Sequence, residues 1–443
     1  MEVWMEQMLT YGVVAILCLA TIYFYMRSLK KKSQITEKKV AIAKEAGMFE
    51  PISLHPYIDL KTCIGSAACV SACPEKDILG IVNGKATVIN ATSCIGHGAC
   101  FHDCPVEAIS LRIGTEKRGV DLPHINENFE TNIKGIYIAG ELGGMGLIKN
   151  SVEQGKQAVD SIVAAKKEKK TDIDLVIVGS GPAGISASLA AKKQGLNAVT
   201  LEQDSLGGTV YTFPRSKIVM TAPMDLPLHG KVKLYDTSKD ELLNLWKTVI
   251  KENNLKIVEN TKVERIQPLE DGTFKVITST NVAYATNNVL LAIGRRGSPR
   301  KLGVEGEESQ KVAYRLLDAE QIKGKKVVVV GGGDSAVESA MLLMDQNDVT
   351  LSYRKDKFSR IKPKNREKIT KAIENQQLNM IFNSNLVKIS DDQIDLKMED
   401  GTIQSIENDM VYIFAGGELP TKFLEKAGVA ITKRFGYIVK KHK

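Results

Sequence analysis

Six of the seven cysteines lie close together in the sequence and form an internal repeat. The repeated residues are Cys63, Cys69 and Cys73 in the first run and Cys94, Cys100 and Cys104 in the second. The two runs have the same spacing, and a proline follows the last cysteine of each. Clustered thiolates bind iron–sulfur centres or zinc, but the proline is a feature of iron–sulfur runs. We therefore predict two iron–sulfur sites, with structural zinc or disulfides as the alternatives.

The duplicated run resembles the bacterial-type two-cluster ferredoxins over about residues 54–113. In that family the last cysteine of each run ligates the neighbouring cluster. The resemblance therefore implies two ligand sets that cross between the runs. They are Cys63, Cys69 and Cys104 for one cluster and Cys94, Cys100 and Cys73 for the other.

The second cysteine of each ferredoxin run is replaced in this chain. Ser66 stands at that position in the first run and His97 in the second. Three cysteines suffice for a 3Fe-4S centre, whereas a 4Fe-4S centre needs a fourth donor, which the Ser66 oxygen or the His97 nitrogen could supply. The alternative is that both side chains only cap their loops through hydrogen bonds.

A glycine-rich turn follows the short apolar run of residues 174–178. Gly179, Gly181 and Gly184 have the G-x-G-x-x-G spacing, and a helical pattern comes next. Such glycines let the backbone approach a pyrophosphate at the N-terminus of a helix. The following apolar run ends at Glu202, whose carboxylate can accept hydrogen bonds from a ribose 2′-hydroxyl. We predict a dinucleotide site for an unphosphorylated ribose.

A second glycine-rich turn follows the apolar run 326–330 and contains Gly331, Gly333, Asp334 and Ser335. The next strand ends in Arg354 and Lys355, at the offset where the first site has an acid. Basic side chains suit a ribose 2′-phosphate and leave a free 2′-hydroxyl without an acceptor. We predict NADPH in preference to NADH at this site, with a solvated basic turn as the alternative.

Two such folds in series resemble the thioredoxin-reductase-like branch of the flavin and pyridine-nucleotide oxidoreductases, over about residues 115–443. The resemblance rests on the turn at residues 331–338 and on the strand and turn of residues 290–295. It also rests on Gly207, Gly208 and Thr209, which resemble the glycine pair beneath the flavin. It implies FAD in the first site and NADPH in the second.

One motif of this family is out of order here. The strand that holds the ribityl chain of the flavin follows the NADPH domain in the family, but its likeness lies at residues 128–141 and ends in Gly140 and Glu141. We infer a circular permutation in which residues 166–171 are the new linker, a rearrangement that chain termini close in space make tolerable. Glu141 stands where the family has aspartate.

Residues 7–26 contain no charged side chain, and their length matches the roughly 20 apolar residues that span a bilayer. Arg27 and the lysines at 30–32 follow at once, which by the positive-inside rule places the rest of the chain in the cytoplasm. We predict a single-pass anchor in the inner, cytoplasmic membrane. A buried helix or a processed signal sequence is the alternative.

These motifs predict an α/β fold with two Rossmann-like domains, for FAD and NAD(P), a small α+β bacterial-ferredoxin-like domain and one N-terminal transmembrane helix. The expected segments are the anchor (1–28), a basic linker (29–53), the iron–sulfur domain (54–113), the permuted part of the FAD domain (114–170), the FAD-binding domain (171–300), the NAD(P)H-binding domain (301–420) and a return segment to the FAD domain (421–443).

The predicted function is a membrane-anchored oxidoreductase that passes electrons between NADPH, FAD, two iron–sulfur clusters and a partner protein or quinone. No cysteine follows Cys104, so the redox Cys-x-x-Cys of thioredoxin reductases is absent. A reductase of disulfides or low-molecular-weight thiols and a redox-sensing binding module are the alternatives. A homodimer is expected only by analogy with the family. The net charge of +8 does not by itself predict nucleic-acid binding, because the sequence contains no recognisable nucleic-acid-binding module.

Overall fold

The computed structural model describes residues 2–45, 49–51, 53–75, 77–94, 96, 98–143, 147–165, 168–211, 218–220, 223–234, 236–295, 299–358 and 361–442. The chain divides into two compact units. The first consists of Met1–Gly119 with Phe435–Lys443, and the second of Val120–Arg434. The first unit carries the cysteine repeat, and the second carries both glycine-rich turns.

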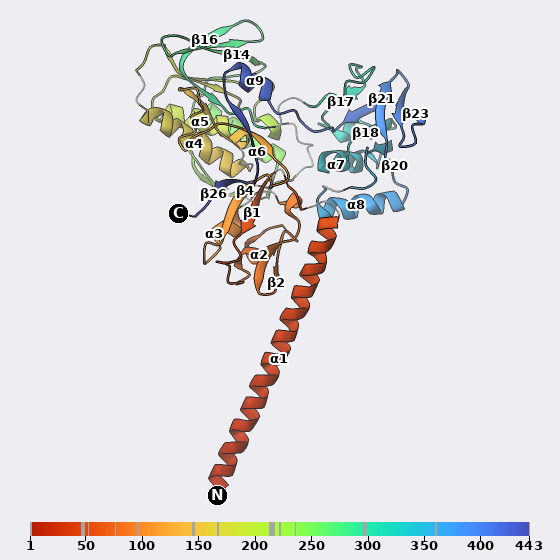
Figure 1. Ribbon diagram of the computed structural model, residues 1–443. Coiled ribbons are helices and arrows are strands. Elements are labelled where there is room, and N and C mark those ends of the chain that lie inside the picture. The colour runs from red at the N-terminus through yellow and green to blue at the C-terminus, as the bar shows by residue number, and fades with distance from the viewer. Residues whose placement is uncertain are drawn as a thin grey trace. The chain divides into compact units, whose positions relative to one another are not determined.

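The N-terminal helix α1 spans Glu2–Glu45 without a break (Figure 1). The residues after the apolar stretch are rich in Lys, Glu and Ala, which favour helix, so the expected linker 29–53 is helical as far as Glu45. In the described part of the chain, the helix from Gln7 onwards is the one long and apolar enough to cross a membrane. A signal sequence near an N-terminus can pass the same test of length and composition.

The iron–sulfur module of the first unit is built from short elements. They are β1 (Leu54–Ile58), α2 (Ala68–Ala72), β2 (Leu79–Val82), β3 (Lys85–Val88), the 3-10 turn η1 (Ala91–Ser93), α3 (Ala99–His102) and β4 (Ile109–Ile113). Strands β1 and β4 are antiparallel, and β2 and β3 form a hairpin. The buried core includes Ile78, Ile109, Leu111 and Ile113. Each cysteine run therefore wraps around one small helix between strands.

The C-terminal strand β26 (Tyr437–Lys440) pairs antiparallel with β4 and completes a three-stranded sheet, β1-β4-β26. The segment 421–443 was expected to return to the FAD domain as a whole, and for the residues from Phe435 onwards this expectation is wrong. The free edge of β4 accepts the backbone hydrogen bonds of β26, a long-range pairing with no local sequence signature.

The flavin-domain sheet in the second unit has the order β13-β8-β7-β16-β15-β14. Its strands are β7 (Ile173–Val178), β8 (Ala198–Leu201), β13 (Ile257–Val258), β14 (Val263–Pro268), β15 (Phe274–Thr278) and β16 (Ala283–Leu291). Strands β13, β8, β7 and β16 run parallel, whereas β14 and β15 are antiparallel additions. The carboxyl end of β7 leads into the first glycine-rich turn.

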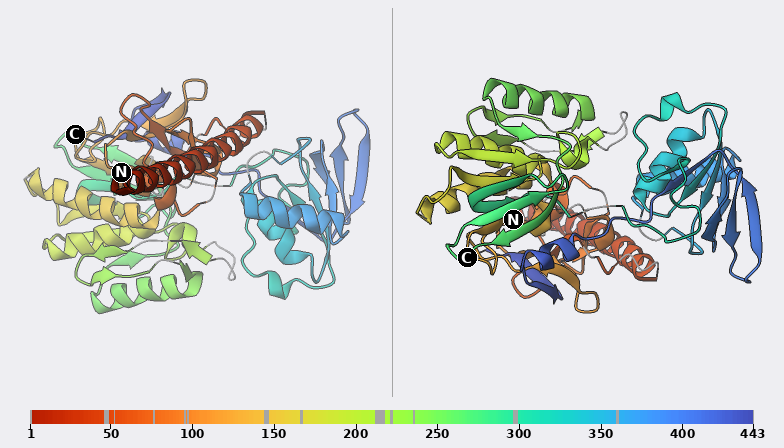
Figure 2. Two further views of the ribbon diagram at one scale, coloured as in Figure 1. Left: turned by 90° about the horizontal axis from the view of Figure 1, so that it is seen from below. Right: turned by 90° about the horizontal axis from the view of Figure 1, so that it is seen from above.

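Strand β6 (Ile136–Ile138) lies in this sheet, parallel to β16 and in register with Val289–Leu291. It is the seventh strand, and it is followed by the 3-10 turn η2 (Glu141–Gly143) and by α4 (Ile148–Ala164). Helix α4 lies beside α5 (Pro182–Lys193), as Figure 2 shows. A Cβ on Gly155 would lie 2.1 Å from the carbonyl oxygen of Ala183, so glycine is required at this helix contact. This placement is what the inferred permutation requires.

Further elements complete the flavin domain. They are the pair β5 (Val120–Pro123) and β25 (Ile431–Arg434), the 3-10 turn η3 (Gly208–Val210), the pairs β9 (Ile218–Met220) with β12 (Asp236–Ser238) and β10 (Met224–Leu226) with β11 (Gly230–Val232), α6 (Lys239–Glu252) and α9 (Thr421–Lys426). Leu424 and Val429 pack in the same core as Ile138 and Val176. The first half of the expected return segment thus belongs to the flavin domain.

The remaining part of the second unit is a parallel five-stranded sheet with the order β17-β24-β18-β19-β20. Its strands are β17 (Val312–Ala313), β18 (Lys326–Val330), β19 (Asp348–Ser352), β20 (Asn379–Ile381) and β24 (Met410–Ile413). The 3-10 turn η4 (Ala319–Gln321), helices α7 (Asp334–Leu343) and α8 (Pro363–Glu374), and the antiparallel sheet β21 (Asn385–Ile389), β22 (Gln393–Lys397) and β23 (Ile403–Glu407) complete it. The second glycine-rich turn joins β18 to α7.

Candidate functional site

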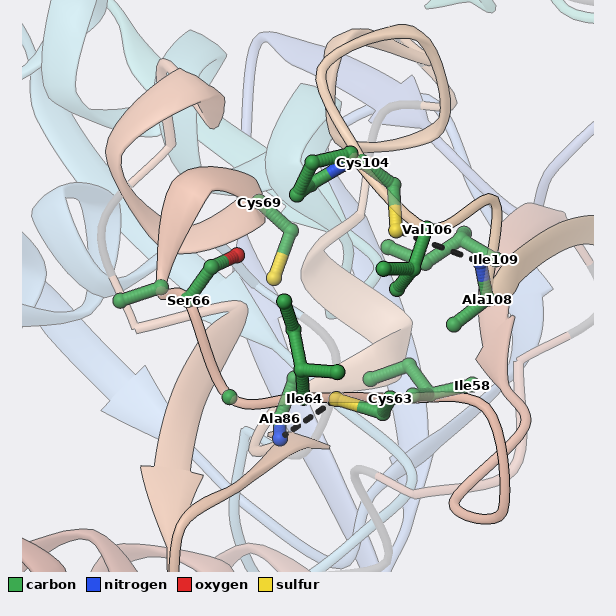
Figure 3. Close-up of a pocket in the computed structure, with 13 residues that line it drawn as sticks. Ile58, Cys63, Ile64, Ser66, Cys69, Ala86, Cys104, Val106, Ala108 and Ile109 are labelled. Carbon is green, nitrogen blue, oxygen red and sulfur yellow. Dashed lines mark hydrogen bonds between the residues drawn. The ribbon is translucent and has the colours of Figure 1, made fainter.

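The first cysteine site is a cavity lined by Cys63, Cys69 and Cys104, whose sulfur atoms point into it (Figure 3). Cys63 follows β1, Cys69 lies in α2, and Cys104 comes from the second run, after α3. Both halves of the repeat therefore contribute to this site, which we call site 1. Its three thiols are the set that the ferredoxin resemblance implies for one cluster.

The second cavity, site 2, is lined by Cys73, Cys94 and Cys100 together with apolar side chains, among them Ile78 and Leu79. Cys73 comes from the first run, and the other two come from the second. The crossing of ligand sets thus appears in both cavities. The physical reason is that α2 and α3 pack against each other, which brings the end of each run to the start of the other.

Backbone amides donate hydrogen bonds to the thiol sulfurs. The Ala86 N–H lies 3.4 Å from Cys63 Sγ, the Ala108 N–H lies 3.2 Å from Cys104 Sγ, and at site 2 the Gly96 N–H lies 3.4 Å from Cys94 Sγ. Donors of this kind stabilise thiolate ligands and tune the potential of a bound cluster.

Burial holds the site 2 thiols in their neutral form. It raises the pKa of Cys94 to about 11 and, with repulsion from Cys94 and Cys73, that of Cys100 to about 12. Burial also raises the pKa of Cys69, with a smaller contribution from Cys104. Metal ligation requires thiolates, so loading these sites releases protons.

A single metal ion and a cluster require different arrangements of their ligands. Within the described residues, no three His, Cys, Asp or Glu side chains are close enough together to hold a single metal ion. A zinc ion needs ligands at about 2.0–2.3 Å, whereas a multi-iron cluster separates its ligands more widely. All seven cysteines are free thiols in the structure. Three buried or half-buried thiols around one cavity, some of them accepting backbone amide hydrogen bonds, therefore fit an iron–sulfur centre.

The two candidate fourth ligands are placed differently. Ser66 lines site 1, and its oxygen lies on the Cys69 side of the cavity (Figure 3). This Oγ accepts a hydrogen bond from the Ala68 N–H at 3.5 Å, which is the loop-capping role. His97 lies outside the described residues. Ligation by either residue stays a prediction.

The first nucleotide turn has the close approaches that its glycines require. Gly179 has a φ of +102°, and a Cβ there would lie 2.6 Å from the Ala292 carbonyl oxygen. A Cβ on Gly184 would lie 1.8 Å from the Gly179 carbonyl oxygen, whereas one on Gly181 would meet nothing within 4 Å. Gly181 thus leaves space in front of the N-terminus of α5, where a pyrophosphate can approach the backbone amides.

Glu202 is buried at the end of β8 and organises this turn. Its Oε2 accepts hydrogen bonds from the Ser180 N–H at 2.7 Å and the Ser180 hydroxyl at 3.0 Å, and its Oε1 accepts one from the Asp204 N–H at 3.1 Å. Each carboxylate oxygen has two lone pairs, so capacity for a ribose hydroxyl remains.

The predicted flavin contacts gather around the same turn. A Cβ on Gly208 would lie 3.3 Å from Gly181 Cα, and the Gly207 N–H donates to the Ser180 carbonyl at 3.2 Å. Thr209 follows in the 3-10 turn η3. Gly140, at the end of β6, has a φ of +86° and lies against Ala183 of α5. Strand β6 therefore places Gly140 beside the first glycine-rich turn, where a residue that contacts the flavin must lie.

Glu141 follows Gly140 and interacts electrostatically with Arg295, which ends the turn of residues 290–295. Burial lowers the pKa of Arg295, and the negative charges of Glu141 and Asp121 oppose this shift. The negative charge of Glu141 thus offsets part of the cost of burying the Arg295 guanidinium.

The second nucleotide turn is closed on one side and open on the other. A Cβ on Gly331 would lie 2.7 Å from the Phe414 carbonyl oxygen, whereas one on Gly333 would meet nothing within 4 Å. Asp334 Oδ1 accepts hydrogen bonds from the Lys362 N–H at 2.8 Å and from Asn365 Nδ2 at 2.7 Å. Ser335 is exposed in the first turn of α7.

Arg354 and Lys355 are exposed directly beyond β19, at the edge of the sheet to which the second turn also belongs. Arg360, a further basic residue near them in sequence, lies outside the described residues. The positions of both basic side chains suit the 2′-phosphate of NADPH, and nucleotide preference stays a prediction.

Two polar contacts at the nucleotide turns were not expected from the sequence. Gln154 Oε1, on α4, accepts the Gly140 N–H at 2.8 Å. Asn365, at the start of α8, ties Asp334 to Glu338 through 2.7 and 2.9 Å hydrogen bonds. Gln154 lies in the permuted segment 114–170, on the helix that follows strand β6, so its position in the sequence was a usable signal. No sequence signal pointed to Asn365, because its hydrogen bonds join two separate helices, α8 and α7.

The comparisons with known proteins match both parts of this geometry. The family model described as pyridine nucleotide-disulphide oxidoreductase matches residues 176–442, more than half of the chain. The chain belongs to this family. A 4Fe-4S dicluster domain model matches residues 55–105, so the predicted combination of a ferredoxin-like module with a reductase is confirmed. This member of the family is a flavin-dependent NAD(P)H oxidoreductase with an iron–sulfur domain.

Similar curated proteins include the bacilliredoxin reductase Bdr of Bacillus subtilis, 27% identical over 59% of this chain and 82% of that protein. The ferredoxin–NADP reductase of Ignicoccus hospitalis is 30% identical over 42% of this chain and 57% of that protein. Among solved structures, the bacillithiol disulfide reductase Bdr of Bacillus cereus has a TM-score of 0.53 at 24% identity, over 61% of this chain and 86% of that one. This last likeness shows the fold alone.

Proposed function

We propose that this oxidoreductase is anchored in the inner membrane and passes electrons from NADPH, through FAD and two iron–sulfur clusters, to a redox partner at the cytoplasmic face. The observation that carries the proposal is the placement of the cysteines. Six of them line the two cavities, Cys18 lies in α1, and the sequence has none after Cys104. The reductase part therefore has no thiol relay of its own.

The chemistry of the cofactors fits this order. Flavin takes up a hydride from a nicotinamide and can release two electrons singly, and each iron–sulfur centre carries one electron at a time. The residues that hold FAD are those of the first turn, with Glu202, Gly140, Glu141 and the 207–209 segment. The second turn, with Arg354 and Lys355, holds NADPH.

A second candidate is reduction of a disulfide, because one similar curated protein is a bacilliredoxin reductase and a bacillithiol disulfide reductase shares the fold. Such a reaction needs either a reactive cysteine near the flavin or direct attack of reduced flavin on the disulfide. The reductase part has no cysteine in its sequence, so it has no reactive thiol of its own near the flavin. We therefore rank electron transfer through the clusters first.

The membrane part of the proposal rests on α1 alone. Its apolar stretch, with basic residues from Arg27 onwards, has the composition of a single-pass anchor with a cytoplasmic domain behind it. Membrane fractionation of the full chain, with and without alkaline carbonate, checks this. An anchored protein stays in the pellet, whereas recovery of a chain that begins near residue 27 would indicate a processed signal sequence instead.

The test of the electron path is an anaerobic titration of the cluster-loaded protein with NADPH, followed by optical absorption and low-temperature EPR. The expected result is flavin bleaching together with signals of reduced clusters. Bleaching with silent clusters, in a sample whose iron content is full, would contradict transfer to the clusters. Rapid NADPH-dependent reduction of bacillithiol disulfide would instead support the second candidate function, a thiol-disulfide reductase.

A further inference from the structure

Helix α1 docks on the iron–sulfur module, and the docking begins just past the apolar stretch. Residues 21–32 of the helix are exposed, whereas Ser33, Thr36, Val40 and Ala43 are half-buried or buried. These four positions are spaced three or four residues apart and form one stripe along the helix. The basic end of the helix is therefore attached to the module along a defined face.

The partner of this stripe is the hairpin β2–β3. The Asn83 N–H donates to Ser33 Oγ at 2.9 Å, and Lys39 Nζ pairs with Asp77 Oδ1 at 2.5 Å. A Cβ on Gly80 would lie 2.6 Å from Thr36 Cγ2, so the helix rests directly on the strand backbone. The hairpin turn contacts Ser33, and the start of the hairpin contacts Lys39.

The hairpin turn also supports the loop of site 1. A Cβ on Gly65 would lie 1.9 Å from the Gly84 carbonyl oxygen, and Lys85 Nζ donates to the Cys63 carbonyl at 2.5 Å. The start of the hairpin supports site 2 instead, because Ile78 and Leu79 line that cavity. Site 1 is thus linked to the helix at the level of Ser33, and site 2 at the level of Lys39.

The positions of Ser33 and Lys39 along α1 give the distance of each site from the apolar stretch. Ser33 lies seven residues past Met26, the end of the apolar stretch 7–26, which is about 10 Å along a helix. Lys39 lies about 9 Å further from the membrane, at 1.5 Å per residue. The loop of site 1 also exposes two apolar side chains, Leu60 at 56% and Ile64 at 63%. The membrane-side site therefore has an apolar surface.

From this geometry we propose that site 1 is the exit of the electron path, and that its acceptor is a quinone dissolved in the bilayer. This inference rests on the proposed function and names its acceptor. The overall reaction converts NADPH, a solvent proton and a quinone into NADP⁺ and a quinol. The hydride carries two electrons and one proton, and solvent provides the second proton. The helix segment 33–43 positions site 1 for this transfer.

The test moves the module away from the membrane without undocking it. A helical insert of seven residues after Leu29 adds about 10 Å and nearly two full turns, so the stripe keeps its face. The matched control places the same insert after Glu2, on the other side of the apolar stretch. Both chains are reconstituted in phosphatidylcholine vesicles that contain a long-chain isoprenoid quinone, and NADPH-dependent quinol formation is measured beside reduction of soluble ferricyanide.

We expect the inner insert to lower quinone reduction at least about tenfold, since small displacements of reacting groups are costly. Ferricyanide reduction should be unchanged, and the outer insert should change neither rate. Equal quinone rates in both inserted chains would overturn the proposal. Ferricyanide reduction without any quinone reduction in the unmodified chain would also overturn it while leaving the proposed function intact, whereas failure of NADPH to bleach the flavin would overturn the proposed function itself.

A readout independent of turnover uses the site 1 loop. Ile64→Trp, in a chain whose native Trp4 and Trp246 are replaced by Phe, places the sole tryptophan at this exposed position. Lipids brominated near the headgroup quench tryptophan that lies at the membrane interface. We expect quenching in this chain without an insert and its loss when the inner insert is added. Absence of quenching in the first chain would overturn the membrane-side placement of site 1, whatever the rates are.

Discussion

Gly184 and Gly181 stand in one turn but have different surroundings. A Cβ at Gly184 would lie 1.8 Å from a carbonyl oxygen, whereas a Cβ at Gly181 would enter open space. We expect Gly184→Ala to destabilise the flavin domain by about 1–3 kcal/mol through overpacking and to lose bound flavin. Gly181→Ala should keep the fold and weaken flavin binding alone. Thermal unfolding and flavin content of both variants check this, and equal unfolding temperatures would contradict it.

His55 gives the iron–sulfur module a pH dependence. Burial lowers the pKa of His55 below its ordinary value of 6.5, although its hydrogen bond with the Ser53 carbonyl opposes the shift. Since the unfolded chain then binds a proton more readily than the folded one, stability is full above pH 6.5 and falls below it. His55→Gln should reduce this loss of stability at low pH. Urea unfolding at pH 7.5 and 5.5 measures the free energy of unfolding of both chains. An equal loss in the two chains would contradict the role of His55.

At the scale of elements, strand β26 decides which unit the C-terminus stabilises. It pairs with β4, and His442 stacks on Phe101 at 3.7 Å and interacts with its carbonyl at 3.0 Å. We expect a chain that ends at Gly436 to lose iron–sulfur content and to keep its flavin, because only the module loses a strand. Iron, sulfide and flavin analyses measure both. Lys441→Ala, at an exposed position of the same segment, serves as the control. Loss of flavin with retained iron would contradict this prediction.

For the whole molecule, the proposed function assigns flavin reduction to the second unit and onward electron transfer to the first. Cys69→Ala removes a thiol from site 1 and touches no nucleotide turn. We expect NADPH to bleach the flavin at an unchanged rate in this variant, whereas electron transfer to an external acceptor falls by at least about tenfold, the range over which removal of one essential group acts. Stopped-flow absorption and steady-state ferricyanide reduction separate the steps. Slowed bleaching would indicate that the units are coupled more closely than proposed.

From the sequence alone we predicted the features that local spacing encodes. The glycine turns, the acid of Glu202 and the basic pair at 354–355 each follow a strand directly, and the cysteine runs repeat within one short segment, so neighbouring residues carry the signal. The tertiary structure decided the grouping of cysteines into sites 1 and 2, the docking of α1 on β2–β3 and the pairing of β26 with β4. The grouping was expected only from the ferredoxin resemblance, and neither of the other two was expected. All three join residues far apart in the chain, and such contacts are set by packing and free strand edges, for which no local sequence pattern exists.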